Sequence, residues 1–421
     1  MLTTLADRLE QGLLGVDPAT WPYGWVVRLA LMVLMALAAF GFIAVFAGPV
    51  TWVERRLAAR MMSRIGPNRV GPQGVLQWLA DGLKCFLKED LIPAQADQAM
   101  FRLAPYLVFG GFMATFVVLP FGANIVAADL DVGLLYLLAI SGLVVIGILM
   151  AGWASNSKWA LFGGIRSAAQ LVSYEIPSAF GLMSVVLAAG TLSMQGIVHA
   201  QGGWPWEWFL FKNPFLFIAY FVSLTAAVAE GNRTPFDLPE GESELVAGFH
   251  VEYSGMRFLW FMFAEWGNLW VISALVTVTF LGGWQVPGVS PDTLGGATGW
   301  AFAGWQALSF VVFATKVSAV VAFVIQLRWT LPRLRVDQMM LLCWKYLVPL
   351  ALLCVAGALV LLVAVPEGGV VDWALRGLVM LVFLGLLVAY VKAVRAAYMA
   401  DRDLYERMEG KELWYPPYRL P

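Results

Sequence analysis

The sequence predicts an all-α polytopic membrane protein with about nine transmembrane helices. Of its 421 residues, 60% are apolar and only 13% are charged, and the mean hydropathy is +0.75. This composition lies outside the usual balance of a soluble protein. Runs of about 20 apolar residues cross a bilayer as a helix. Nine such runs occur, at 26–52, 103–121, 133–153, 171–190, 213–230, 257–280, 302–327, 346–365 and 372–395.

The distribution of positive charge predicts the orientation. Five of the segments between and after the apolar runs hold 22 of the 27 Lys and Arg residues, and Lys and Arg favour the cytoplasmic side of a membrane. An odd number of crossings then places the N-terminus outside and the C-terminus in the cytoplasm, for a chain in the cell's inner (plasma) membrane. These five segments are 53–102, 154–170, 231–257, 328–345 and 392–421.

The longest polar interruption, 53–102, predicts a structure on the membrane surface. The stretch from Gly66 to Pro72 cannot continue a helix, because it contains two prolines and two glycines. After it, apolar residues recur at helical spacing opposite polar ones, which is typical of an amphipathic interfacial helix. By itself this helix is interpreted as a surface anchor. Its apolar positions are Val75, Leu76, Leu79, Leu83, Phe86 and Leu87.

Acidic residues gather beside the apolar runs. A charged side chain inside a bilayer costs about 2.5–3.5 kcal/mol even on the lenient insertion scale, so such residues are usually functional. Carboxyl groups held close together can exchange protons near neutral pH. The loop after the fifth run holds Glu230, Asp237, Glu240, Glu242, Glu244 and Glu252, and further acids stand at or inside the ends of runs, at Glu54, Glu175 and Glu265.

Glu175 is the sharpest single candidate, because it lies inside the fourth run. Pro177 cannot donate a hydrogen bond to the carbonyl group of Ser173, which predicts a free acceptor where water could be held. The alternative is an interfacial acid paired with Arg166 or Lys158. For the other acids, the alternative is a solvated loop with a structural salt bridge to Arg55 or Arg233.

The chain lacks the ligand patterns of an electron carrier. Its three cysteines have no C-x-x-C spacing, and its two histidines, His199 and His250, lie far apart in the sequence. The sequence therefore predicts no iron–sulfur cluster, no haem and no metal site. Neither a dinucleotide-binding nor a Walker motif is present. We also find no internal repeat of the kind common in secondary transporters.

Five motifs, in this order, carry a resemblance to a known family. The chain resembles the H subunit, which is the quinone-proximal membrane subunit, of the proton-pumping NADH–quinone oxidoreductases (respiratory complex I), from about residue 25 to about residue 365. The motifs are Glu54–Arg56 (E-R-R), Arg64–Pro72 (R-I-G-P-N-R-V-G-P), Ala151–Lys158 (A-G-W-A-S-N-S-K), Ser173–Pro177 (S-Y-E-I-P) and Ala229–Asp237 (A-E-G-N-R-T-P-F-D).

The resemblance implies three parts of the chain: an outside N-terminal segment, 1–24, a core of eight spans, 25–365, and a ninth span with a cytoplasmic tail, 366–421. It also implies that the polar segment 53–102 frames a chamber for a quinone, which is bound as substrate. The residues of this chamber would be Arg55, Arg56, Arg64, Arg69, Arg233 and Phe236, and a proton relay would use Glu175, Glu230, Glu265, Glu54, Asp237, Glu240, Glu242, Glu244 and Glu252.

In this family the membrane subunit is a non-redox part of a translocating enzyme. The resemblance implies that cytoplasmic partner subunits carry FMN and the iron–sulfur clusters, and that other membrane subunits lie alongside. Related subunits of hydrogenase-linked or other-donor energy-converting complexes share weaker forms of the motifs and remain an alternative. A secondary ion transporter is the alternative from another class, against which the acidic cytoplasmic loop and the missing repeats argue.

The charge distribution generates a first prediction, which is that a reporter fused to the C-terminus is active in the cytoplasm and one fused to the N-terminus is active outside. The reason is the excess of Lys and Arg in alternate connections together with an odd number of spans. Paired fusions of a reporter that works only outside and one that works only inside give the measurement. A C-terminal fusion active only on the outer side would mean that one of the nine spans is false.

Overall fold

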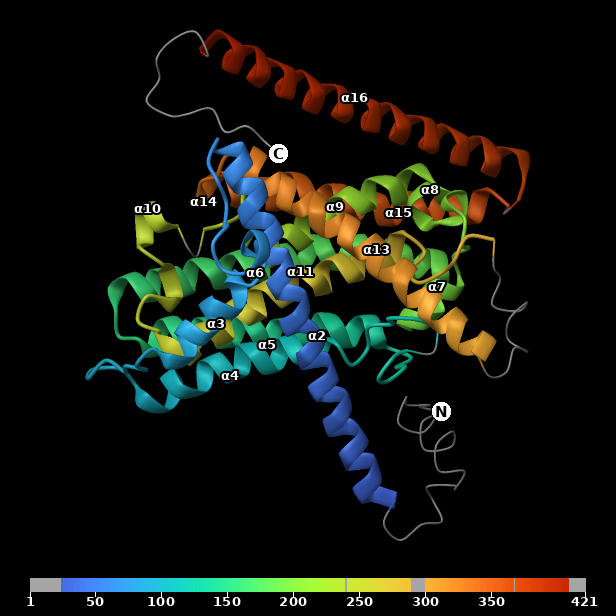
Figure 1. Ribbon diagram of the computed structural model, residues 1–421. Helices are drawn as coiled ribbons and strands as arrows, with labels where there is room; N and C mark the ends of the chain where they lie inside the picture. The colour runs from blue at the N-terminus through green and yellow to red at the C-terminus, as the bar shows by residue number, and fades with distance from the viewer. Residues whose placement is uncertain (1–23, 124, 239–240, 289–299, 367, 409–421) are drawn as a thin grey trace.

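The computed structural model describes residues 24–123, 125–238, 241–288, 300–366 and 368–408, and within these ranges the chain forms helices and no strand. Figure 1 shows α4, α5, α6 and α11 running side by side, with α2 crossing them and α16 along one edge. The bounds of the long helices are α2 Gly24–Met61, α4 Gln98–Thr115, α5 Gly133–Ala154, α6 Lys158–Ala189, α9 Pro214–Glu230, α11 Gly255–Phe280, α13 Trp300–Thr330, α15 Val348–Ala364 and α16 Val370–Met408.

Shorter helical pieces connect them. They are η1 Pro72–Gly74, α3 Gln77–Leu87, α7 Met194–His199, η2 Pro205–Glu207, α8 Phe209–Lys212, α10 Glu242–Leu245, η3 Gly248–His250, α14 Val336–Leu341 and the π-helical turn η4 Leu342–Leu347. All but residue 24 of the segment 1–24, and the last part of the predicted tail, lie outside the described residues.

The predicted fold class is confirmed, and within the described residues a helix forms in each of the nine predicted ranges, although α4 ends at Thr115 and leaves the last part of the range 103–121 non-helical. Seven helices are long and apolar enough to cross a membrane: α2, α5, α6, α11, α13, α14 to α15, and α16. The other two ranges form α9, which has only 17 residues, and α4, whose first turns carry Gln98 and Arg102. Helix α9 is therefore shorter, and α4 less apolar, than a typical membrane span.

Close approach of α5 and α6 depends on small residues. A Cβ atom on Gly152 would lie 2.7 Å from the carbonyl oxygen of Ala160 and 3.0 Å from the Cα of Gly164. Small residues allow helix backbones in a membrane to approach in this way. The turn between the two helices is tight, since Asn156 has a φ of 48°. Helix α6 consequently begins well before the apolar run that predicted it.

Helix α6 is locked to the segment α14–α15. The carbonyl oxygen of Ser173, freed by Pro177, accepts a hydrogen bond from the thiol of Cys343 at 3.1 Å, so the prediction of a free acceptor there is wrong. The hydroxyl group of Tyr174 donates to the carbonyl oxygen of Met339 at 3.0 Å. Cys343 belongs to η4, where the widened π-helical turn brings its side chain to the break in α6.

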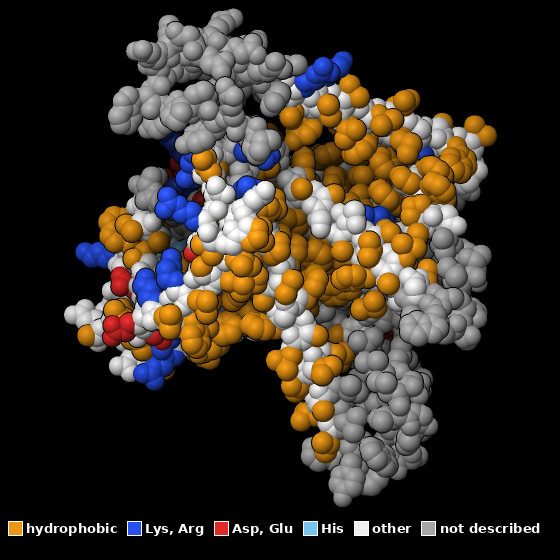
Figure 2. Space-filling model, viewed as in Figure 1, with side chains coloured by type: hydrophobic (Ala, Val, Ile, Leu, Met, Phe, Trp, Pro, Cys, Tyr) orange, Lys and Arg blue, Asp and Glu red, His pale blue; other side chains and the backbone are white. Residues whose placement is uncertain are grey.

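The predicted amphipathic helix forms α3. Its apolar residues Leu79, Leu83, Phe86 and Leu87 are exposed by 43 to 82%, which suits a helix lying in the membrane interface. Indole Nε1 of Trp52, on α2, donates to the carbonyl oxygen of Gln73 at 3.1 Å and holds the preceding loop against α2. Figure 2 shows charged side chains gathered at the end of the bundle where α3 and α10 lie, while hydrophobic side chains cover its flanks.

Helix α16 is attached to the body by few contacts. Phe383 packs against Phe211 of α8 and Phe217 of α9, with ring centroids 5.3 and 6.4 Å away, and Tyr390 lies 6.4 Å from Phe323 of α13. Within the apolar 18-residue stretch of α16, only 6% of the residues are buried. The ninth span therefore lies on the rim of the bundle.

The close packing of α6 generates a second prediction. A Cβ atom on Gly163 would lie 2.6 Å from backbone atoms of Gly248 and Phe249, so Gly163→Ala forces the two backbones apart. We expect a loss of about 1–3 kcal/mol, measured as a lower midpoint of thermal unfolding. The matched control is Gly142→Ala on α5, where a Cβ atom meets nothing within 4 Å. Equal effects of the two substitutions would contradict this packing.

Candidate functional site

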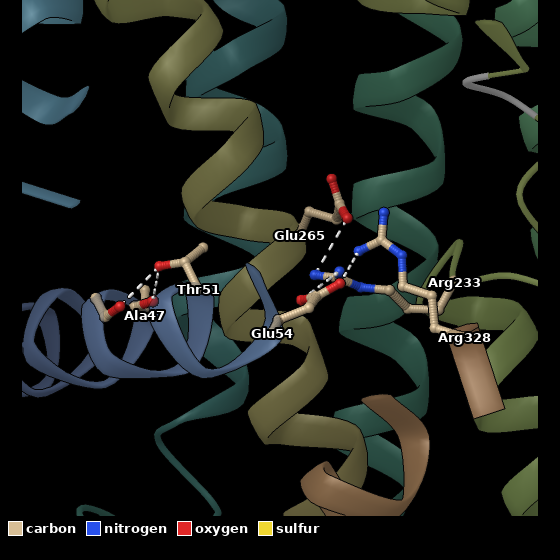
Figure 3. A network of polar contacts seen from close by, with 7 residues as sticks. Ala47, Thr51, Glu54, Arg233, Glu265 and Arg328 are labelled. Carbon is tan, nitrogen blue, oxygen red and sulfur yellow. Dashed lines mark hydrogen bonds and ion pairs between the residues drawn. The ribbon is translucent and has the colours of Figure 1, made fainter. Parts of the chain in front are cut away.

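Four charged side chains meet where α2, α11, α13 and the loop after α9 come together (Figure 3). This charge cluster consists of Glu54, Arg233, Glu265 and Arg328. Nη1 of Arg328 donates to Oε1 of Glu54 at 2.6 Å. Arg233 approaches Oε2 of Glu54 at 3.6 Å and Oε1 of Glu265 at 3.2 Å. Glu54 comes from α2 and Arg328 from α13, so the cluster joins distant parts of the chain.

Arg233 is the centre of the charge cluster. Its side chain is only 2% exposed, and its guanidinium carbon lies 4.2 Å from the ring centroid of Trp266. The distances to Glu54 and Glu265 are those of ion pairs, but the guanidinium nitrogens form no hydrogen bond of good geometry with the described residues. A buried cation is tolerated only where opposite charges compensate it, so these two carboxylates are needed to keep Arg233 in place.

Asp237 lies beside the charge cluster in the same loop. Burial raises the pKa of its carboxyl group, and the charge of Glu265 adds to this effect, while the guanidinium groups of Arg328, Arg333 and Arg233 lower it. Its Oδ1 atom is enclosed and receives no hydrogen bond from the described residues. The opposing influences leave Asp237 more easily protonated than a solvated aspartate.

A cavity of about 80 Å³ begins at the charge cluster and continues between α4, α5, α6 and α11. A water molecule needs about 10–15 Å³ of such space, so the cavity has room for several. It brings together three of the predicted relay acids, Glu175, Glu230 and Glu265. Polar side chains from three other positions share its wall, namely Thr115, Ser141 and Asn268.

Glu175 is hydrogen-bonded to a serine and forms no ion pair with the part of the chain that the structure describes. Oγ of Ser141 lies 3.2 Å from Oε1 of Glu175 and 2.7 Å from the carbonyl oxygen of Leu138. The hydroxyl group has one hydrogen. It can donate to an ionised Glu175, or donate to Leu138 while it accepts a hydrogen bond from a protonated Glu175. The predicted alternative partner, Arg166, pairs with Glu244 instead.

Glu230 is the last residue of α9 and lies close enough to Glu175 for their charges to repel each other. The hydroxyl group of Ser178 is hydrogen-bonded to its carboxyl group, while Oε1 is enclosed and receives no hydrogen bond from the described residues. Asn268 donates to its backbone carbonyl oxygen at 3.4 Å. The structure thus brings Glu54, Glu230, Glu265 and Glu175 into one connected region.

Two further predicted relay acids that the structure describes, Glu244 and Glu252, do not line the cavity. Glu240 is outside the described residues, and Glu242 begins α10 but its side chain is not described. Glu244 is exposed, and its hydrogen bond with Arg166, 2.7 Å long, lowers its pKa. Glu252 is half-buried and does not line the cavity. The acidic loop therefore divides into an inner part, up to Asp237, and an outer part.

None of the six predicted quinone residues lines this cavity. Arg55 pairs with Asp81 at 2.6 Å, and Arg56 donates to Oε1 of Gln73 at 3.0 Å. Arg64 and Arg69 are exposed. Arg233 belongs to the charge cluster, and Phe236 is buried with its ring 5.3 Å from that of Tyr174.

Sequence reasoning missed Ser141, Asn268 and Arg328. Each is a polar residue inside an apolar run or at its end, which is the signal that identified the acids, but hydroxyl and amide groups cost too little in a membrane to stand out. Among the described residues, no group of His, Cys, Asp and Glu is arranged to hold a metal ion.

Comparison with known proteins gives a consistent result. The profile of the family described as NADH dehydrogenase matches residues 32–359. The chain is similar to the NADH-quinone oxidoreductase H subunit of Anaeromyxobacter dehalogenans, with 54% identity over 356 residues, 82% of this chain and 86% of that protein. It is 45% identical to the protein of the same name from Chlorobaculum parvum, covering 84% of this chain and 95% of that protein.

The charge cluster generates a third prediction. Arg328→Gln leaves Glu54 with Arg233 alone, and removing one partner of a buried ion pair costs on the order of 3 kcal/mol. The double substitution Glu54→Gln with Arg328→Gln leaves Arg233 paired with Glu265 and should cost clearly less than the sum of the single substitutions. The measurement is the thermal unfolding midpoint of the four proteins. Strictly additive losses would show that the two side chains do not interact.

Proposed function

The chain belongs to the NADH dehydrogenase family, and on this premise we propose that it is the H subunit of a proton-translocating NADH–quinone oxidoreductase, respiratory complex I. In this proposal it helps to form the quinone chamber and couples quinone reduction to proton movement. The names of the relatives favour NADH as the electron source over a hydrogenase-linked or other donor. The placement of acids inside a multi-pass membrane bundle favours a role in proton transfer.

The observation that carries the proposal is the shared cavity of Glu175, Glu230 and Glu265. Intramembrane acids facing a bundle interior are typical of proton relays. The ion pair from Glu265 to Arg233, and from Arg233 to Glu54, links this cavity to the cytoplasmic end of α2. A change of charge at that end would alter the electrostatic potential felt by the cavity acids, because interactions between buried charges are weakly screened.

Protons would move between the cavity acids through water. Reduction of a quinone to a quinol consumes protons, so acids near the chamber would change their charge during the reaction. In this proposal Glu54 and Asp237 face the cytoplasmic side, and Glu230 and Glu175 lie deeper in the membrane. Ser141 would hold Glu175 in either protonation state, since its hydroxyl group can donate or accept.

The quinone chamber would open at the loop before α3. The loop before α3 is tied to the end of α2 by Trp52 and Arg56, and the apolar residues of α3 are exposed beside it. An apolar doorway with a few polar groups suits a quinone. Arg55, Arg56, Arg64 and Arg69 would surround this doorway, whereas Arg233 and Phe236 would support the chamber from behind.

The electron carriers would belong to partner subunits in the cytoplasm, with FMN and the iron–sulfur clusters, and this chain would bind quinone as substrate without carrying a redox group. Other membrane subunits of the complex would cover part of the apolar flanks. We propose that the chain lies in the inner membrane with its C-terminus in the cytoplasm.

The fourth prediction tests the relay. Glu175→Gln keeps the size of the side chain and its hydrogen bonding but cannot exchange a proton. We expect the complex to assemble, and quinone reduction and proton translocation to fall together by about tenfold or more. A tightly coupled enzyme stalls when its proton cannot move, because moving one charge against 100 mV costs about 2.3 kcal/mol. Reconstituted vesicles report both quantities, and electron transfer to an artificial acceptor upstream of the quinone should survive.

The control for this experiment is Glu244→Gln, which makes the same chemical change at an exposed acid outside the cavity. It should leave both rates close to those of the unchanged complex. Full proton pumping by a correctly assembled Glu175→Gln complex would rule out the relay role of Glu175.

A further inference from the structure

We infer that Gln170 is a positioning residue, which fixes the segment from Ala229 to Phe236 and thereby the places of Glu230 and Arg233. The inference rests on the proposed function of these two residues. Gln170 lies on α6 and is completely buried. Its Nε2 atom donates to the carbonyl oxygens of Ala229 and Phe236, at 2.7 and 2.8 Å. Oδ1 of Asn232 lies 3.2 Å from the same atom.

The orientation of the amide group follows from these partners. All three are oxygen atoms that accept hydrogen bonds, so a flipped amide would place oxygen against oxygen. Oε1 of Gln170 is enclosed and receives no hydrogen bond from the described residues. The two hydrogens on Nε2 are therefore what holds this side chain and the segment together.

The segment from Ala229 to Phe236 carries the side chains of Glu230 and Arg233. Glu230 follows Ala229 directly, and Arg233 lies midway between the two carbonyl groups that Gln170 binds. Within the segment the chain turns sharply, since Asn232 has a φ of 50°. The amide NH of Phe236 donates to the carbonyl oxygen of Arg233 at 2.8 Å. Gln170 thus ties together the beginning and the end of one turn, with the charged residues between them.

Small movements of this turn matter because Arg233 is buried and is compensated by two ion pairs whose energy depends on distance. Arg233 lies 3.2 Å from Glu265 and 3.6 Å from Glu54, and the Coulomb energy of buried charges changes steeply at such separations. Gln170 does not line the cavity. It acts through Arg233 and Glu230, by holding the two groups at a fixed distance from the cavity acids.

The test compares two substitutions at this position. Gln170→Met keeps the approximate volume but removes both hydrogen-bond donors. We expect the assembled complex to reduce quinone at least about tenfold more slowly, because misplacing a functional group by about 1 Å can cost a hundredfold. Gln170→Glu has the shape of glutamine, but it can donate only when its carboxyl group is protonated.

The pH profile distinguishes a role of Gln170 in positioning from a general effect on packing. The ratio of the Gln170→Glu rate to the wild-type rate should fall as pH rises, since an ionised carboxylate would face three acceptors. The ratio for Gln170→Met should stay flat and low. Taking ratios cancels the titration of Glu54, Glu230, Asp237 and the other acids that all the proteins share. A Gln170→Glu ratio that is flat and near one would overturn the inference, even if the methionine variant fails to assemble.

The matched control is Gln201→Met. Gln201 is also buried, and its Nε2 donates to the carbonyl oxygen of Val278 at 2.9 Å, at the other end of α11. This substitution removes buried hydrogen bonds far from the charge cluster. It should therefore lower stability but leave the rate of quinone reduction per assembled complex unchanged. An equal slowing by Gln201→Met and Gln170→Met would assign the effect to general packing.

The outcome also separates this inference from the proposed function. If the relay itself is wrong, Glu175→Gln pumps normally. If only the role of Gln170 is wrong, Glu175→Gln remains impaired while Gln170→Met works at the wild-type rate.

Discussion

The ion pairs of Arg233 are the constraint on which this end of the helix bundle depends. A guanidinium group that is almost completely buried must be surrounded by negative charge, and here that charge comes from Glu54 on α2 and Glu265 on α11. Glu54 in turn binds Arg328 on α13. Three helices and a loop are therefore held in one arrangement, because moving any of them away would leave a charge unpaired beside hydrocarbon.

Elsewhere in the bundle, backbone carbonyl groups left free by irregular backbone also receive partners from other helices. Pro177 removes one backbone donor from α6, and the thiol of Cys343 supplies a substitute from the π-helical turn. Gln170 supplies donors to the turn after α9. In water such groups would be solvated, but inside a membrane each needs a protein partner. The irregular places of the fold are consequently the places where helices are joined most specifically.

Much of the fold could be predicted from sequence, because the length and hydropathy of a run report on its own surroundings. The helical ranges, the amphipathic α3 and the acids of α6, α9 and α11 were found in this way. Partners across the bundle could not be found, since hydropathy does not say which helices meet. Glu54 and Arg328 form an ion pair although they are 274 positions apart in the sequence. Arg166 pairs with Glu244, although Glu175 is nearer to it in the sequence. Phe236 is predicted to face the chamber but is buried against Tyr174.

The loose attachment of α16 has a consequence for how the chain can vary in evolution. The family match ends at residue 359, and the helices before α16 already enclose the charge cluster and the cavity. Because α16 touches the body through one face, with Arg376, Val379, Phe383 and Tyr390 among its contacts, most of its positions are free to change without disturbing those helices. The outer surface of this last span can therefore change between lineages while the interior of the bundle stays the same.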